Sequence, residues 1–166
     1  MRLEALLDSP MAFGSSHADA AAFPDAVWRE RAAREAGSEA CATFVACDAA
    51  GAWVGMASTE PLTEVPDHVH VHAVYVSPAH RGHTGPAGRL VDAAVRFARD
   101  NTDASWLTLG VHESNERALT FYRRLGFEAT GKVVPHPLDP AERLCIMGFG
   151  RFRVPDVTHR SPQRPG

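Results

Sequence analysis

The sequence has little cysteine, and the cysteines it has lack the spacing of a structural motif. Of its 166 residues only Cys41, Cys47 and Cys145 are cysteines, an odd number without a C-x-x-C pair. This pattern argues against a disulfide framework or a zinc ribbon and favours a reducing compartment. The three residues are therefore predicted to be free thiols in the core, and no metal is expected.

Long apolar runs and an excess of positive charge are also missing. Residues 1–8 carry charges where a signal peptide needs an apolar run, and no later segment is as long as a membrane span. A formal net charge of −3 gives no electrostatic footprint for nucleic acid or an anionic membrane. The sequence predicts a cytoplasmic protein that binds neither.

The chain is long enough for one domain with a core and too short for two of ordinary size. No internal repeat is visible. Residues 1–153 are predicted to form this single domain. Residues 154–166 are rich in proline, arginine and serine and are predicted to be a disordered tail.

Hydrophobic periodicity predicts a mixture of helices and strands. A strand, a crossover helix and another strand over residues 68–111 imply a parallel pair, whereas residues 41–58 form a hairpin. The predicted helices are residues 2–9, 19–36, 87–100 and 115–125, and the predicted strands are residues 41–47, 52–58, 68–76 and 106–111, with two more from residue 127 to residue 152. Gly126 is predicted to end the last helix as its left-handed cap.

The segment from Val76 to Val91 is the most informative, because a strand ends there in a glycine-rich turn that opens a helix. The free N–H groups and positive dipole end of a helix start favour an anion such as phosphate. The glycines are Gly82, Gly85 and Gly88, without the Gly-Lys-Ser or Gly-Lys-Thr of a P-loop. An anion site of another kind is therefore predicted.

Two segments resemble the Gcn5-related N-acetyltransferase (GNAT) family. They are Val76-x-Pro78-x-x-Arg81-Gly82 and Asn115-x-x-Ala118-x-x-x-Tyr122-x-x-x-Gly126-Phe127. The resemblance covers roughly residues 2–150 and implies an α/β (α+β) fold. In that fold a mixed, mostly antiparallel central sheet with a splayed parallel pair is flanked by helices. The family's first strand precedes its first helix, and Met1 already lies at or in that helix, so either this strand is missing or the sequence begins late. The sheet edge left open is exposed or covered by a partner chain, as in a homodimer.

The resemblance also implies acetyl-CoA as the acyl-donor cosubstrate, with its pyrophosphate at the turn from Arg81 to Ala87. In the family the strand before this turn hydrogen-bonds the pantetheine arm through its backbone, and one N–H polarises the thioester carbonyl. The residues expected to bind the cosubstrate are Val74, Val76, Arg81, Gly82, His83, Thr84, Gly85, Ala87, Asn115 and Tyr122.

The turn departs from the family pattern by one residue. Members read Arg-Gly-x-Gly-x-Gly or Arg-Gly-x-Gly-x-Ala, whereas Arg81 to Ala87 holds one residue more, treated as an insertion at His83 or Thr84. Pro86 has no N–H to donate inside the turn, although it suits a first helical position. The turn is therefore expected to bind CoA with fewer backbone donors.

Acetyl transfer to an amine needs a proton acceptor for the amine and a donor for the leaving thiolate. The resemblance implies Tyr122 as the acid, and the alternative is that Tyr122 only packs against the sheet. Asn115 is expected to cap its helix, to contact CoA, or both.

The base is predicted among the histidines of the strand at residues 68–76. Alternation places His68, His70 and His72 on one face, and His70 falls where the family often has a glutamate. His70 or His72 is therefore the predicted base, directly or through water. The same three histidines could bind zinc, but the sequence specifies no cysteine or carboxylate elsewhere as a further ligand. The other alternative is that these histidines have no functional role.

The function predicted from these features is acetyl transfer from acetyl-CoA to a primary amine of a small molecule. The alternatives are a protein or peptide N-acetyltransferase and a degenerate module that binds acyl-CoA or a partner without turnover. The acceptor pocket is expected between the N-terminal helices and the loops at residues 60–66 and 135–140.

Overall fold

The computed structural model describes residues 1–150 and residue 152, so the predicted tail lies outside the described residues. Its elements are α1 (Arg2–Asp8), the 3-10 turn η1 (Pro10–Ala12), α2 (His17–Ala21), α3 (Asp25–Ala36), β1 (Ala42–Cys47), β2 (Trp53–Pro61), β3 (His68–Val76), the 3-10 turn η2 (Pro78–His80), α4 (Ala87–Asn101), β4 (Trp106–His112), α5 (Glu116–Arg124), β5 (Phe127–Pro135) and β6 (Arg143–Phe149). No helix of this part of the chain is long and apolar enough to cross a membrane.

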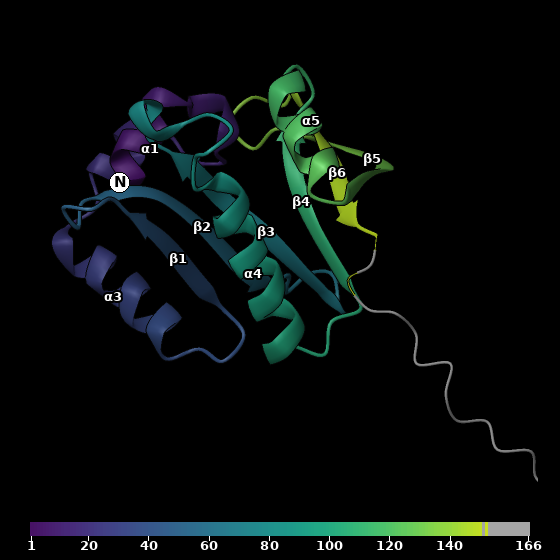
Figure 1. Cartoon of the computed structure of the whole chain (residues 1–166), viewed down its shortest axis with the longest axis horizontal. Helices are drawn as coiled ribbons and strands as arrows, with labels where there is room; N and C mark the ends of the chain where they lie inside the picture. Colours follow the sequence, from purple (N-terminus) through teal and green to yellow (C-terminus); the bar gives the residue numbers. More distant parts are fainter. Residues whose placement is uncertain (151, 153–166) are drawn as a thin grey trace, which may run out of the picture.

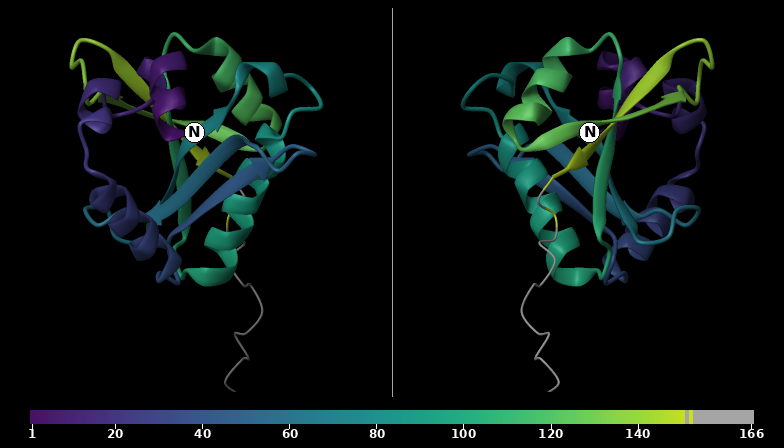
Figure 2. Two further views of the ribbon diagram at one scale, coloured as in Figure 1. Left: turned by 90° about the vertical axis from the view of Figure 1, so that its left-hand side faces the viewer. Right: turned by 90° about the vertical axis from the view of Figure 1, so that its right-hand side faces the viewer.

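The strands form one mixed sheet with the order β1-β2-β3-β4-β6-β5 (Figure 1). Only β3 and β4 are parallel, and every other neighbouring pair is antiparallel, which confirms the predicted fold class. Across residues 1–150 no strand precedes α1, so β1 is an edge of the sheet. Helix α4 covers one face of β1–β3, and α1 and α2 cover the other (Figure 2).

The parallel pair is short, and this opens the sheet. β3 and β4 pair over three positions, His68–His70 with Trp106–Thr108. Beyond them β3 continues along β2, whereas β4 pairs with β6, so the two strands diverge (Figure 1). A bulge in β3 accompanies the divergence, since Ala73 has a φ of 52° and the register with β2 shifts there.

Helix α4 supplies much of the core. Leu90, Val91 and Ala94 are buried as the periodicity predicts, and Val95 and Ala98 extend the stripe. All but Leu90 pack with buried valines and leucines of β3 and β4, and Leu90 packs with Ala57 and Val76. Phe97 of the same helix is only half-buried, and its ring lies 5.9 Å from that of Phe44.

Two predictions from the sequence are wrong. The single helix at residues 19–36 is two helices, since Pro24 lacks an N–H and disfavours helical backbone at the preceding residue. Helix α3 has no fully buried residue, and its half-buried Trp28 packs against the core cluster formed with α1. The cysteines are not core thiols either, because Cys47 on the edge strand is exposed and Cys41 and Cys145 are only half-buried.

Candidate active site

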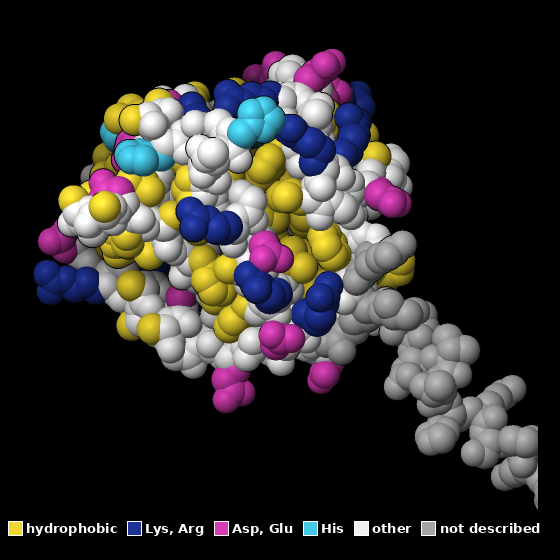
Figure 3. All heavy atoms as spheres, viewed as in Figure 1, with side chains coloured by type: hydrophobic (Ala, Val, Ile, Leu, Met, Phe, Trp, Pro, Cys, Tyr) yellow, Lys and Arg dark blue, Asp and Glu magenta, His cyan; other side chains and the backbone are white. Residues whose placement is uncertain are grey.

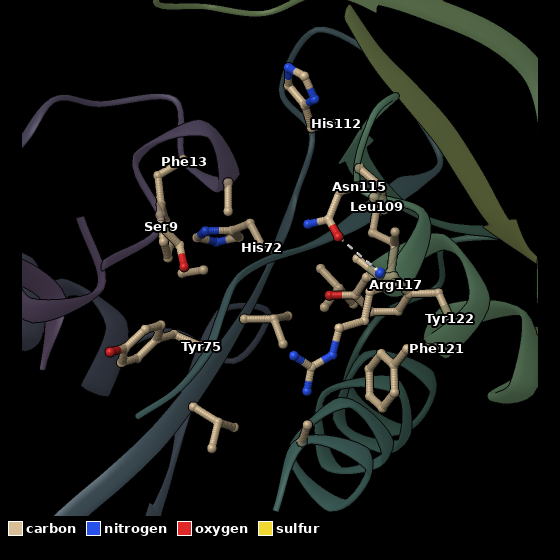
Figure 4. A pocket seen from close by; sticks show the side chains of 18 of the residues that line it. Ser9, Phe13, His72, Tyr75, Leu109, His112, Asn115, Arg117, Phe121 and Tyr122 are labelled. Carbon is tan, nitrogen blue, oxygen red and sulfur yellow. Dashed lines mark hydrogen bonds between the residues drawn. The ribbon is translucent and has the colours of Figure 1, made fainter. Parts of the chain in front are cut away.

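A cavity of about 1160 Å³ occupies the gap between β3 and β4. It extends from α1 and η1 to α5 and the segment at residues 136–144. Figure 4 shows Ser9, Phe13 and His72 on one side of it and Phe121 and Tyr122 on the other. All twelve predicted site residues line it: His70, His72, Val74, Val76, Arg81, Gly82, His83, Thr84, Gly85, Ala87, Asn115 and Tyr122.

The backbone of β3 offers donors to this cavity. The N–H of Ser77 donates to Val54 O of β2 at 2.9 Å. Because successive N–H groups of a strand point to opposite sides, those of Val76 and Val74 point away from β2 and toward the gap. β4 does not pair with this part of β3, and both residues line the cavity.

The turn before α4 is shaped by two of its glycines. Gly82 has a φ of 119°, which L side chains rarely adopt, and a Cβ on Gly85 would lie 2.5 Å from His80 O. The N–H of Gly85 donates to Gly82 O, whereas those of His83 and Thr84 have no partner in the described part of the chain. The N–H groups that open α4 at Ala87 are free as at any helix start.

Pro86 is not the first residue of α4, as its conformation suggested, but the residue just before it. It is the N-cap of α4, and its carbonyl accepts the N–H of Leu90 at 2.9 Å. The turn thus ends in a residue without a donor, as the departure from the family pattern suggests.

The side chain of Arg81 is engaged within the protein. Its Nε donates to Val76 O at 2.8 Å, and its Nη2 forms an ion pair with Asp8 at the end of α1. The guanidinium also lies 5.5 Å from the centre of the Tyr75 ring. Arg81 therefore ties the turn to α1, and an anion at the turn would meet backbone N–H groups first.

Tyr122 points from α5 into the cavity (Figure 4). Its ring is 9% exposed and makes edge contacts with Phe121 and Phe127. Burial raises the pKa of its phenol well above the usual 10, so the group stays protonated at neutral pH. Its hydroxyl has no hydrogen-bond partner among the described residues, which leaves it free for a ligand.

Asn115 caps α5, as predicted, because its Oδ1 accepts the N–H of Ala118 at 3.0 Å. Its amide nitrogen has no described partner. The sequence prediction missed Arg2 of α1, which lines the cavity, and three arginines at the other end: Arg89 on the first turn of α4, and Arg117 and Arg124 on α5. The i, i+4, i+7 spacing of residues 117, 121 and 124 on one helix face is the signal that could have found two of them.

These three arginines form no ion pair within the described residues. Figure 3 shows Lys and Arg side chains gathered over α5. The α5 end of the cavity therefore has uncompensated positive charge.

His70 is held beside β4. Its Nδ1 lies 3.1 Å from Thr108 Oγ1, opposite it in the parallel pair. Burial, and to a smaller extent the neighbouring His72, lower the pKa of His70 to about 4. The imidazole is therefore neutral at physiological pH and a weak base.

His72 lies nearer the cavity mouth, with Nε2 3.4 Å from Oε1 of Glu60 and 36% of its side chain exposed. Burial lowers the pKa of His72 overall; the carboxylates of Glu60 and Glu35 offset part of this effect, and the charge of Arg2 adds to it. An imidazole facing both a carboxylate and a cavity can accept a proton from a ligand.

The other wall contains two buried histidines that the sequence did not single out. The Nδ1 of His112 accepts the N–H of Ser114 at 3.3 Å, so Nε2 carries the proton and lies 3.1 Å from Glu142, off the axis of a good hydrogen bond. The ring of His136 lies 6.0 Å away. No cluster within the described residues is suited to a metal ion.

The segments at which the acceptor is expected differ in their relation to the cavity. Residues of α1, η1 and the loop after β5 line the cavity, whereas residues 60–66 do not.

Comparisons with known proteins identify related sequences and folds. The model of the acetyltransferase (GNAT) family matches residues 3–127. The peptidyl-lysine N-acetyltransferase YjaB of Escherichia coli K12 is 36% identical over 63 residues, which are 38% of this chain and 38% of that protein. The chain thus matches well under half the length of that relative.

Solved structures share the fold. Nourseothricin acetyltransferase is 29% identical, with a TM-score of 0.57 over 66% of this chain and 64% of that chain. The Vibrio cholerae spermidine N-acetyltransferase in complex with CoA and spermine is 17% identical, with a TM-score of 0.69 over 88% of this chain and 84% of that chain. At this identity the second match shows the fold alone.

Proposed function

The chain belongs to the acetyltransferase (GNAT) family, and from this premise we propose that it transfers acetyl from acetyl-CoA to a primary amine of a small molecule. The observation that carries the proposal is the opening between β3 and β4, into which backbone donors, a tyrosine and two histidines all point.

The residues of the cavity fit acetyl-CoA. Free N–H groups of the turn and of the α4 start suit a pyrophosphate, and Arg89, Arg117 and Arg124 suit its charges. The N–H groups of Val74 and Val76 lie where they would bond the carbonyls of an extended arm. The amide nitrogen of Asn115 is a further donor, so the site offers partners along the length of such a ligand.

Acetyl-CoA would supply a thioester carbonyl and a thiolate leaving group. His72 accepts the proton of the amine, whose nitrogen then forms a bond to the carbonyl carbon as the carbon–sulfur bond breaks. A backbone N–H of β3 stabilises the negative charge that develops on the carbonyl oxygen. Tyr122, protonated at neutral pH, donates its proton to the departing sulfur and is reprotonated by the second proton that the nitrogen loses as the amide forms, so that the products are the amide, the thiol of CoA and protonated His72.

His72 is a better base than His70 because of their surroundings. Taking a proton from an ammonium of pKa near 10 onto a group of pKa about 4 is unfavourable by roughly 8 kcal/mol. Glu60 stabilises the protonated form of His72, and the described structure gives His70 no such carboxylate. We therefore assign His72 as the base and His70 as a positioning residue.

A small acceptor is favoured because α1, η1 and Pro137 enclose the side of the cavity opposite α5. A peptide lysine remains the second candidate, since one relative is a peptidyl-lysine N-acetyltransferase. The single domain at residues 1–153, the cytoplasmic location and the homodimer stay predictions from the sequence.

Calorimetry with acetyl-CoA, followed by a thiol-release assay with a panel of amines, tests the proposal. Binding with release of thiol that depends on the amine is the expected result. Absence of binding at millimolar acetyl-CoA would contradict it, and binding without release for any amine would favour the module without turnover.

A further inference from the structure

The residues that line the cavity include no aspartate or glutamate among those the structure describes, although the proposed acceptor is a cationic amine in water. An amine site usually contains carboxylates that balance the positive charge. This cavity instead contains Arg2 at its acceptor end, on the side of Phe13 and away from α5. Its charge pattern favours an acceptor that brings a negative charge.

Arg2 is held in a fixed position without an acidic partner. Its Nη2 donates to Ser15 Oγ at 3.0 Å, and its guanidinium lies 4.6 Å from the centre of the Phe13 ring. Burial and the nearby charge of Arg31 lower its pKa, which means that the cation is incompletely solvated. Of the five N–H donors of a guanidinium, one is used, so several remain for a ligand.

Four carboxylates that contact cavity residues are occupied by these partners. Each lies outside the lining and within contact distance of a different partner. These pairs are Glu4 with the Tyr75 hydroxyl, Asp8 with Arg81, Glu60 with His72, and Glu142 with His112. Arg2 is thus a cation of the cavity wall for which the described chain provides no anion.

We propose that the acceptor is an amino acid with an apolar side chain, whose carboxylate binds Arg2 while its amino group faces His72. This inference rests on the proposed function, because it names the substrate class of the same site. A guanidinium binds a carboxylate with two parallel hydrogen bonds, which fixes both position and orientation. Arg2 and His72 both line this cavity, so a single acceptor inside it would face both the guanidinium and the imidazole.

The apolar surroundings suit the side chain of such an acceptor. Met11, Phe13, Pro137 and Leu144 all line the cavity. A polyamine, with two or more further cations, would place its charges beside Arg2 without a carboxylate of the wall to offset them. The spermidine enzyme that shares the fold is therefore expected to differ from this chain in its acceptor.

The test compares matched acceptors in a thiol-release assay with acetyl-CoA. Alanine, leucine and phenylalanine are each assayed beside the corresponding amide and the decarboxylated amine, with spermidine as a polycation. We expect kcat/KM for at least one amino acid to exceed that of its matched amine by about 10- to 100-fold, the range expected for a charged hydrogen-bonded pair. A matched amine or spermidine that reacts as well as every amino acid would overturn the inference and leave the acetyltransferase function intact.

Variants then locate the effect. Arg2→Gln should raise KM for the amino acid about 10- to 100-fold, leave the matched amine within about twofold and leave CoA binding unchanged. Arg2→Lys should keep part of the preference, because it keeps the charge. Arg29→Gln is the control, since Arg29 is exposed on α3 and does not line the cavity. Equal losses for amino acid and amine in Arg2→Gln would show a structural role and contradict the inference.

A result without turnover is also informative. Calorimetry of the CoA-loaded protein with each amino acid and its matched amine reports the acceptor site alone. Amino-acid binding that Arg2→Gln weakens would support the carboxylate site while the proposed acetyl transfer fails. No preference for the amino acid in this measurement would overturn the inference.

Discussion

Replacing Tyr122 with phenylalanine should abolish most of the activity without lowering stability. The chain has only two tyrosines, Tyr75 and Tyr122, and both line the cavity. The hydroxyl of Tyr122 has no described partner, whereas that of Tyr75 donates to Glu4 Oε1 at 3.1 Å. The same substitution at the two positions therefore separates a group free for catalysis from one used in structure.

The expected magnitudes follow from these contacts. Tyr122→Phe keeps the ring and its edge contacts with Phe121 and Phe127, so the free energy of unfolding should change by less than about 0.5 kcal/mol. Loss of the acid should reduce kcat by about 10² to 10⁴, or roughly 3 to 5.5 kcal/mol of barrier. Tyr75→Phe should lose one hydrogen bond to a carboxylate, about 0.5–1.5 kcal/mol of stability, and retain most of the turnover.

The assay is thiol release under saturating acetyl-CoA and acceptor, with urea unfolding of the same preparations. Calorimetry with CoA shows whether either variant changes binding. If Tyr122→Phe retained more than about a third of the wild-type kcat, the acid would lie elsewhere. A loss of both activity and stability at Tyr122 would instead favour the packing role.

Three further changes test the other parts of the site. Burial lowers the pKa of His70 from 6.5 to about 4, so as the pH falls the unfolded chain binds a proton before the folded chain does. The free energy of unfolding should therefore fall by up to about 3 kcal/mol between pH 6.5 and pH 4. Urea denaturation of His70→Gln at the same pH values should lack this fall. The new Cβ of Gly85→Ala would force His80 O to move, so this variant should bind CoA at least about tenfold more weakly by calorimetry. The control is Gly88→Ala, whose new Cβ would lie 3.8 Å from the nearest atom, and it should bind CoA normally. Asn115→Asp keeps the oxygen that caps α5, so it should preserve the melting temperature while the affinity for CoA falls. Asn115→Ala should lower the affinity for CoA and also cost about 1 kcal/mol of stability. Equal melting temperatures for the two variants would contradict the capping role of Asn115.

Much of the fold was predictable because its signals are local. The alternation of residues 68–76 and the apolar stripe of α4 follow from backbone geometry and burial, and the strand and helix form there. Pro24 shows the limit of periodicity, since one missing N–H divides a helix that the apolar spacing alone would continue.

The residues of the site could be predicted where they belong to a sequence motif. They could not be predicted where tertiary contacts determine which side chains meet. The turn at residues 81–87, Asn115 and Tyr122 lie at the cavity because a strand and two helices place them there. The pairing of Arg81 with Asp8 and the isolation of Arg2 depend on how α1 packs over β3. No spacing within one segment records that packing.

The three residue pairs that join β3 to β4 have a thermodynamic consequence for any ligand that bridges the gap. The backbone ladders of the sheet form two groups, β1–β3 and β4–β6, connected only through this short contact. A molecule bonded to the N–H groups of Val74 and Val76 on one side and to α5 on the other would act as a reversible cross-link. Its binding free energy would add to the cost of separating the two groups, so amide exchange in β3 and β4 should slow together as the ligand saturates.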